Sequence, residues 1–136
     1  MRKEIILVSF TFLTLAISCQ SSRDCKTDKL YGDWNIINYY KGKLTDIRPL
    51  SKEPFKSDWG PPIKTYKKTG DYLNNQGDHM TKGIFTVDNQ KCLIKEFNDT
   101  EAIGDTVLLE ISYLDDQYLL LTKINDSPYT YFYKRK

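Results

Sequence analysis

The sequence predicts an all-β domain of about eight short antiparallel strands joined by tight turns. Three observations favour this class. Ten Tyr, six Phe and two Trp are many for 136 residues, and aromatic side chains are enriched in strands. Apolar and polar residues alternate in several short runs, which clusters of Gly, Asn and Asp separate. After residue 18, no stretch shows a convincing helical period of apolar residues.

The first 18 residues have the pattern of an export signal, which we expect to be helical. Arg2 and Lys3 precede a mostly apolar run over residues 5–17, which is too short to span a bilayer as a helix. The run ends at Ser18-Cys19, and a polar stretch follows at once. A small residue directly before the cysteine resembles the lipobox of bacterial lipoproteins, in which that cysteine carries lipid. The alternative is an ordinary signal peptide that is cleaved nearby.

Cleavage before Cys19 would leave a polar tether over residues 19–29 and one domain over residues 30–136. The net charge of +2 provides no strongly basic field, so we expect no nucleic-acid partner. We expect a bacterial cell-envelope protein that is anchored to the membrane, most simply the outer membrane, by its N-terminal lipid.

Two cysteines remain if Cys19 is lipidated. Cys25 lies in the predicted tether and Cys92 in a predicted strand. Exported compartments permit disulfides, and a Cys25–Cys92 bridge would pin the tether to the domain. Two free thiols are the alternative, because one sequence does not fix the distance between them. His79 is near neither cysteine in the sequence, so we predict no metal site.

The first predicted strand spans residues 34–40, with Trp34, Ile36, Asn38 and Tyr40 on one face. A long loop over residues 44–62 follows, because prolines and a glycine interrupt any periodicity there. Loops of this length are often functional. Its large apolar residues, Phe55 and Trp59, either plug one end of the core or line a pocket.

Seven further strands are predicted, at residues 63–68, 72–73, 79–87, 92–97, 105–114, 117–124 and 129–135. In the sixth strand along the chain, Val107, Leu109, Ile111 and Tyr113 are expected to share one face. Eight antiparallel strands in succession can close into an up-and-down barrel, which removes the exposed edges. An open sandwich is the alternative architecture.

The opening Leu30-x-Gly32-x-Trp34 resembles that of the lipocalins and, more closely, of short lipocalin-like domains in Gram-negative lipoproteins. The resemblance covers about residues 30–135. It implies that Trp34 closes one end of the barrel beneath a C-terminal arginine, here Arg135, in a stack worth roughly 0.5–2 kcal/mol. It also implies that the loop over residues 44–62 is a lid. The family's Thr-Asp-Tyr-like turn is not evident, which favours a lipocalin-like relative over a standard lipocalin.

Tyr129, Tyr131 and Tyr133 alternate along the last strand, so they are expected to share a face. They would line a cavity if they point inward, or belong to the outer wall or a filled core. We expect a small hydrophobic ligand in or at the mouth of the barrel, with Phe55, Trp59 and these tyrosines as candidate contacts. The alternative is a solid barrel that docks an envelope protein.

The sequence contains no catalytic constellation. Asp78 and His79 are neighbours in a predicted strand, where adjacent side chains point to opposite faces. A hairpin turn explains the paired carboxylates Asp115 and Asp116. The acidic stretch at residues 98–101 lacks the glycine and spacing of a calcium loop. We therefore expect neither an enzyme nor a bound cofactor.

Overall fold

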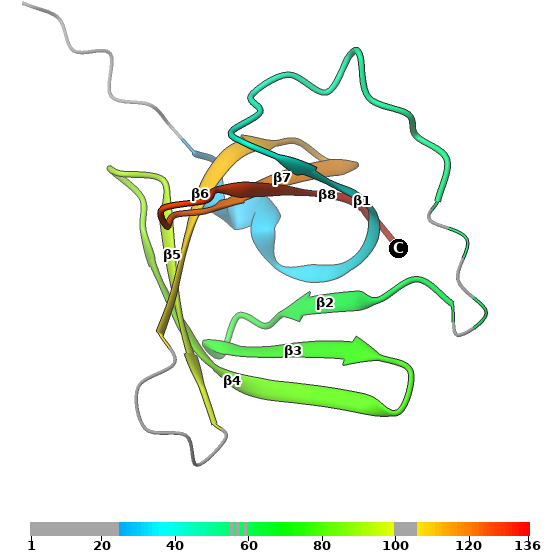
Figure 1. Ribbon diagram of the computed structural model, residues 1–136. Coiled ribbons are helices and arrows are strands. Elements are labelled where there is room, and N and C mark those ends of the chain that lie inside the picture. Colours follow the sequence, from blue (N-terminus) through cyan, green and yellow to red (C-terminus); the bar gives the residue numbers. More distant parts are fainter. Residues whose placement is uncertain (1–24, 55, 57, 59, 100–105) are drawn as a thin grey trace, which may run out of the picture.

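The part of the chain that the computed structural model describes comprises residues 25–54, 56, 58, 60–99 and 106–136. It forms eight antiparallel strands around a closed barrel (Figure 1). Each strand pairs with its neighbour in sequence, and the first also pairs with the last. The predicted up-and-down barrel is confirmed, and the open sandwich is excluded. The strands are β1 (Gly32–Lys41), β2 (Ile63–Tyr66), β3 (Asp71–Gln76), β4 (His79–Asp88), β5 (Leu93–Asn98), β6 (Thr106–Leu114), β7 (Tyr118–Lys123) and β8 (Tyr129–Arg135).

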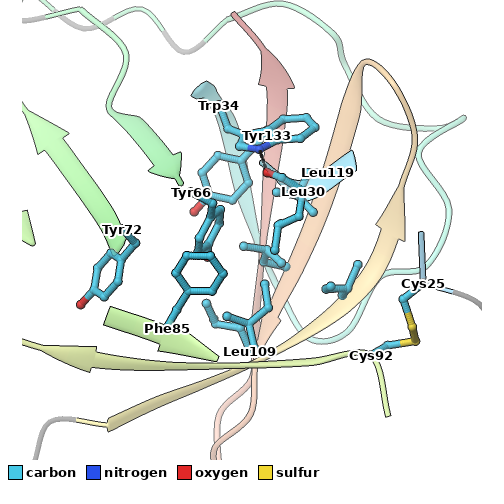
Figure 2. Close-up of a cluster of buried hydrophobic side chains, with 13 residues drawn as sticks. Cys25, Leu30, Trp34, Tyr66, Tyr72, Phe85, Cys92, Leu109, Leu119 and Tyr133 are labelled. Atoms are coloured by element: carbon cyan, nitrogen blue, oxygen red, sulfur yellow. Dashed lines mark hydrogen bonds between the residues drawn. A yellow bond between two sulfur atoms is a disulfide. The ribbon is translucent and has the colours of Figure 1, made fainter. Parts of the chain in front are cut away.

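Large side chains fill the barrel toward one end. Alternate residues of each strand point inward, which brings residues of different strands into one cluster (Figure 2). Trp34, Tyr66 and Leu119 of this cluster are almost completely buried, and burial of a large apolar side chain contributes about 1.5–3 kcal/mol. Tyr66 packs edge-on against Phe85, with 4.9 Å between the ring centroids. This packed layer forms the closed end of the barrel.

A bulge in β1 changes which residues face the interior. The pairing of β1 with β8 shifts register between Ile36 and Asn38, and the extra residue reverses the alternation that follows. Trp34 and Ile36 belong to the inner cluster, whereas Ile37 packs in a second cluster outside the barrel. Tyr39 then lines the interior. The prediction of one continuous face from Trp34 to Tyr40 was therefore wrong for Tyr40, which packs against the outer cluster.

A second bulge, in β6, has the same effect. The pairing of β6 with β7 shifts register between Ile111 and Tyr113. Ile111 packs in the inner cluster, but Tyr113 packs in the outer one. The expected common face from Val107 to Tyr113 therefore ends at Ile111.

The outer cluster is covered by the first part of the loop that follows β1. Ile37, Leu120 and Phe132 are almost completely buried there, and three loop residues pack against them: Leu44, Ile47 and Leu50. The backbone N–H of Leu44 also donates to the Thr130 hydroxyl, at 3.1 Å. This segment covers the outer wall of the barrel, whereas Pro62, at the end of the same loop, lines a cavity inside the barrel. Phe55 and Trp59 lie outside the described residues.

The residues before β1 extend the domain further toward the N-terminus than predicted. Residues 27–30 form a short 3₁₀ helix, η1 (Thr27–Leu30), and its last residue, Leu30, is completely buried. Cys25 is 8% exposed and forms a disulfide with Cys92, with 5.6 Å between their Cα atoms. The predicted bridge is present, and residues 25–29 belong to the folded domain rather than to a polar tether. Cys19 and the predicted signal helix lie outside the described residues.

Candidate ligand-binding cavity

Arg135 and Trp34 close the packed end of the barrel. The Arg135 Cζ atom lies 4.1 Å from the centroid of the Trp34 ring, so the stack that the resemblance implied is present. Arg135 Nη1 donates to the Tyr31 carbonyl at 3.0 Å, Nε donates to the Asp116 carbonyl at 2.8 Å, and Nη2 donates to the Lys29 carbonyl. One guanidinium thereby joins η1, β1, the β6–β7 turn and β8.

Gly32 leaves the space that the guanidinium needs. Its φ is +129°, a conformation that side-chain-bearing residues rarely adopt, and an added Cβ would lie 2.8 Å from Arg135 Nη1. The indole Nε1 of Trp34 donates to the Leu30 carbonyl at 2.7 Å. Each residue of the Leu30-x-Gly32-x-Trp34 opening therefore has a structural role at the closed end.

The opposite half of the barrel holds a cavity of about 580 Å³. This volume lies within the usual range for small-molecule sites, about 300–1,000 Å³. The cavity wall combines apolar residues of four strands with polar residues of the β3–β4 hairpin and of β7. The apolar wall includes Ile36, Ile63, Val107, Leu109, Tyr131 and Tyr133, and the polar wall includes Asn74, Asn75, Gln76, His79, Thr81 and Lys123.

The structure places two of the three predicted tyrosines in the cavity wall. Tyr131 and Tyr133 line the cavity. Tyr129 is 37% exposed and lies outside the lining, with its ring centroid 6.3 Å from that of Tyr39. Tyr39 does line the cavity and is 57% exposed. These two exposed rings lie beside the mouth, which we define by Tyr39, Gln76, His79 and Lys123.

A buried ion pair, which the sequence analysis missed, forms the base of the cavity. Lys64 Nζ lies 2.6 Å from Glu96 Oε1, and their side chains are only 9% and 5% exposed. Both residues line the cavity. The Tyr66 hydroxyl donates to the same Glu96 oxygen, and Tyr66 belongs to the packed cluster below. The sequence shows only the spacing: Lys64 precedes Tyr66 by two residues and Glu96 follows Ile94 by two, which places each on the face of a neighbour that is buried in the structure.

Neighbouring groups offset part of the cost of burying these charges. The Lys64 ammonium lies 5.3 Å from the Tyr66 ring centroid and 5.7 Å from that of Tyr72, within the range of cation–π attraction. Burial still lowers the pKa of the Lys64 ammonium, and Glu96 opposes that change. Burial and the Glu96 charge together raise the pKa of the Tyr66 hydroxyl far above its ordinary value, and raise the pKa of Tyr72 to about 12.

The second carboxylate oxygen of Glu96 is available to a molecule in the cavity. Both the ammonium and the Tyr66 hydroxyl contact Oε1. Among the described residues, Asn98 Oδ1 is the one completely buried side-chain oxygen or nitrogen without a partner. Glu96 lines the cavity, so Oε2, on which neither of these contacts falls, is the carboxylate oxygen left for a molecule in the cavity.

Other charged groups have structural or peripheral positions. Asp115 Oδ1 accepts hydrogen bonds from the backbone N–H groups of Gln117 and Tyr118, both at 2.7 Å, which is the predicted hairpin turn. His79 is exposed at the mouth of the cavity. In the described ranges, no three His, Cys, Asp or Glu side chains gather in a way that could hold a metal ion. The same ranges contain no helix that is long and apolar enough to cross a membrane.

Comparisons with protein-family models, with curated proteins and with solved structures found no match for this chain.

Proposed function

We propose that this protein is a lipid-anchored, lipocalin-like protein of the bacterial cell envelope that binds a small, largely hydrophobic molecule inside its barrel. The observation that carries this proposal is the cavity of about 580 Å³ in the half of the barrel opposite Trp34. A barrel of eight strands is just wide enough to hold one small ligand.

The two halves of the barrel have different contents, which supports a binding role for the cavity. The closed half is filled by the inner cluster and capped by Arg135. The other half retains apolar wall surface from Ile36, Val107 and Leu109. Because the strands close on themselves, this wall is formed before a ligand arrives, so binding requires little ordering of the protein. Apolar ligand surface removed from water there would contribute about 25 cal/mol per Å².

The sequence at the N-terminus supports the proposed anchor and location. Ser18-Cys19 follows an apolar run of signal-peptide length. The Cys25–Cys92 disulfide is typical of proteins in an oxidising compartment outside the cytosol. A lipid on Cys19 would hold the domain close to a membrane surface, where hydrophobic small molecules are concentrated.

A docking function is the second candidate, and the exposed rings beside the mouth favour it. Tyr39 and Tyr129 are 57% and 37% exposed, and Ile124 is 44% exposed in the nearby β7–β8 connection. Aromatic residues are enriched at protein interfaces. In this alternative, an envelope protein would cover the mouth and the cavity would have no ligand.

Native mass spectrometry of the protein, purified with mild detergent from the organism that makes it, separates the two candidates. We expect a one-to-one complex with a small molecule that survives in the gas phase and is lost when the protein is denatured. The mass of the denatured protein is the matched control, because covalent modifications, including the lipid anchor itself, remain on the denatured chain. A ligand-free barrel in a stoichiometric complex with another protein would contradict the binding proposal and support docking.

A further inference from the structure

A charged pair forms the base of the cavity, although apolar residues of four strands form part of its wall. The Lys64–Glu96 pair lies where the inner end of a bound molecule would rest, directly above Tyr66 of the packed cluster. Sequence alternation makes this placement unavoidable once Tyr66 and Ile94 face inward, because Lys64 and Glu96 then face inward too. This pair therefore decides which chemical group can be buried at the base.

A hydrocarbon end would be a poor match for this base. It would displace water from Glu96 Oε2 and from the ammonium, and it could replace none of the lost hydrogen bonds. Leaving a buried charged group without its hydrogen bonds costs more than leaving a neutral one. The apolar contacts along the wall would then have to offset that loss.

A charged ligand end would also be disfavoured. A carboxylate or an ammonium would be attracted by one member of this pair and repelled by the other, because the two charges are only 2.6 Å apart. The pair therefore offers little net attraction to offset the cost of removing a charged group from water. A hydroxyl avoids both problems, because its O–H can donate to Glu96 Oε2 while its oxygen accepts from the Lys64 ammonium.

We propose that the cavity selects amphiphilic molecules whose inner end is an uncharged hydroxyl, bound by Lys64 and Glu96. This inference rests on the proposed ligand-binding function and adds the ligand's chemical class and orientation. The apolar body of the ligand lies against Val107 and Leu109, and its outer end reaches the mouth. Lys123 at the mouth adds a positive charge there, which suits a carboxylate at the outer end.

Two matched probes test the selection: dodecanoate and its ω-hydroxy derivative, measured by isothermal titration calorimetry on the full folded domain. Both place a carboxylate at Lys123, and only the second brings a hydroxyl to the base. We expect the ω-hydroxy probe to bind at least about tenfold more tightly, equivalent to about 1.4 kcal/mol. Dodecanedioate, with a carboxylate at each end, should bind more weakly than the ω-hydroxy probe.

The double variant Lys64→Met, Glu96→Gln should abolish the preference and bring the two affinities within about twofold. Gln retains an acceptor for the Tyr66 hydroxyl. The control is Lys43→Met, Glu110→Gln, which removes a more exposed ion pair of similar length, 2.8 Å, and should retain the preference. If the first variant does not fold, the test uses NMR of wild-type protein labelled with carbon-13 at its glutamate carboxyls. The ω-hydroxy probe should shift the Glu96 resonance, and dodecanoate should shift it much less.

Equal or tighter binding of dodecanoate to the wild-type protein would overturn the inference while leaving the proposed function intact. An unchanged preference in the Lys64, Glu96 double variant would also overturn it. Failure of every probe, together with the absence of any co-purified small molecule, would instead overturn the proposed function and this inference with it.

Discussion

Arg135 stacks on Trp34, with 4.1 Å between the guanidinium carbon and the ring centroid. The two residues are register partners in the β1–β8 pairing that closes the barrel. The same guanidinium donates to carbonyls of η1 and of the β6–β7 turn. The closed end therefore depends on one cation, and Gly32 is the residue that leaves room for it.

Gly32→Ala tests this arrangement. The new methyl group would lie 2.8 Å from Arg135 Nη1, and φ at this position is +129°. We expect the free energy of unfolding to fall by roughly 2–4 kcal/mol, from backbone strain and displacement of the guanidinium together. Urea unfolding monitored by tryptophan fluorescence measures the change. Gly42→Ala is the matched control, because φ is +88° there but the added methyl group meets nothing within 4 Å. Equal losses in the two variants would contradict the close approach of Arg135.

The disulfide should stabilise the domain by restricting the unfolded chain. Cys25 and Cys92 are 67 residues apart in the sequence, and loss of such a bridge typically costs roughly 2–5 kcal/mol. The double variant Cys25→Ser, Cys92→Ser should therefore unfold at lower denaturant than the wild type, and dithiothreitol should reduce the stability of the wild type but not of the variant. Dithiothreitol-insensitive stability of the wild type would contradict this role.

The domain should lose stability in alkaline solution because its buried tyrosines remain protonated. Burial raises the pKa of Tyr66 and Tyr133, and Tyr72 reaches about 12. In the unfolded chain, tyrosines ionise near about pH 10. Above that pH the folded state binds more protons than the unfolded state, so the free energy of unfolding falls as pH rises. The lowered pKa of Lys64 has the opposite effect, because it makes the free energy of unfolding rise with pH. Only this one group contributes to that rise, which ends near the ordinary lysine pKa of 10.5.

Denaturant unfolding at intervals from about pH 9 to about pH 12 measures this dependence. Tyr133→Phe should reduce the slope, since it removes one of the contributing groups. Tyr39→Phe removes a hydroxyl from an exposed ring and is the matched control for the substitution itself. Identical slopes for the wild type and Tyr133→Phe would show that Tyr133 does not contribute.

The lipid anchor has a direct test in Cys19→Ala. We expect this variant to leave the membrane fraction and appear in the soluble fraction after cell breakage, because lipid on Cys19 is the proposed attachment. Cys25→Ala is the control, since it removes the disulfide but not the proposed lipidation site and should stay with the membrane. Membrane association that survives Cys19→Ala in carbonate-washed fractions would count against the lipobox interpretation.

The strand order and the barrel followed from the sequence because period-two alternation is a strong local signal. The sequence did not show which residues face inward beyond Ile36 and Ile111. The reason is that a bulge needs only one extra residue and has no fixed sequence signature. The packing of Leu44 and Ile47 on the outer wall was missed because the outer face of the barrel also carries apolar residues, Ile37, Leu120 and Phe132, and alternation alone does not show that a loop covers them.

The closed end of the site was predictable and the cavity base was not. Trp34 and Arg135 carried a recognisable pattern, and the structure places them in contact. Lys64 and Glu96 looked like ordinary strand polar residues, because the sequence does not show that their neighbours Tyr66 and Ile94 are buried on the same face. Only the register of β2 and β5 brings the two charges to one place.

Filling the cavity with a large side chain tests whether the cavity holds the ligand. Val107→Trp places a large ring in the cavity wall, whereas Thr106→Trp places the same ring at the adjacent exposed position on the outside. Native mass spectrometry should find the co-purified small molecule on the wild type and on Thr106→Trp, and at least about tenfold less of it on Val107→Trp. Circular dichroism must show that all three barrels are folded, because overpacking alone can cost about 1–3 kcal/mol. Full ligand occupancy on a folded Val107→Trp barrel would show that the ligand does not bind in this cavity.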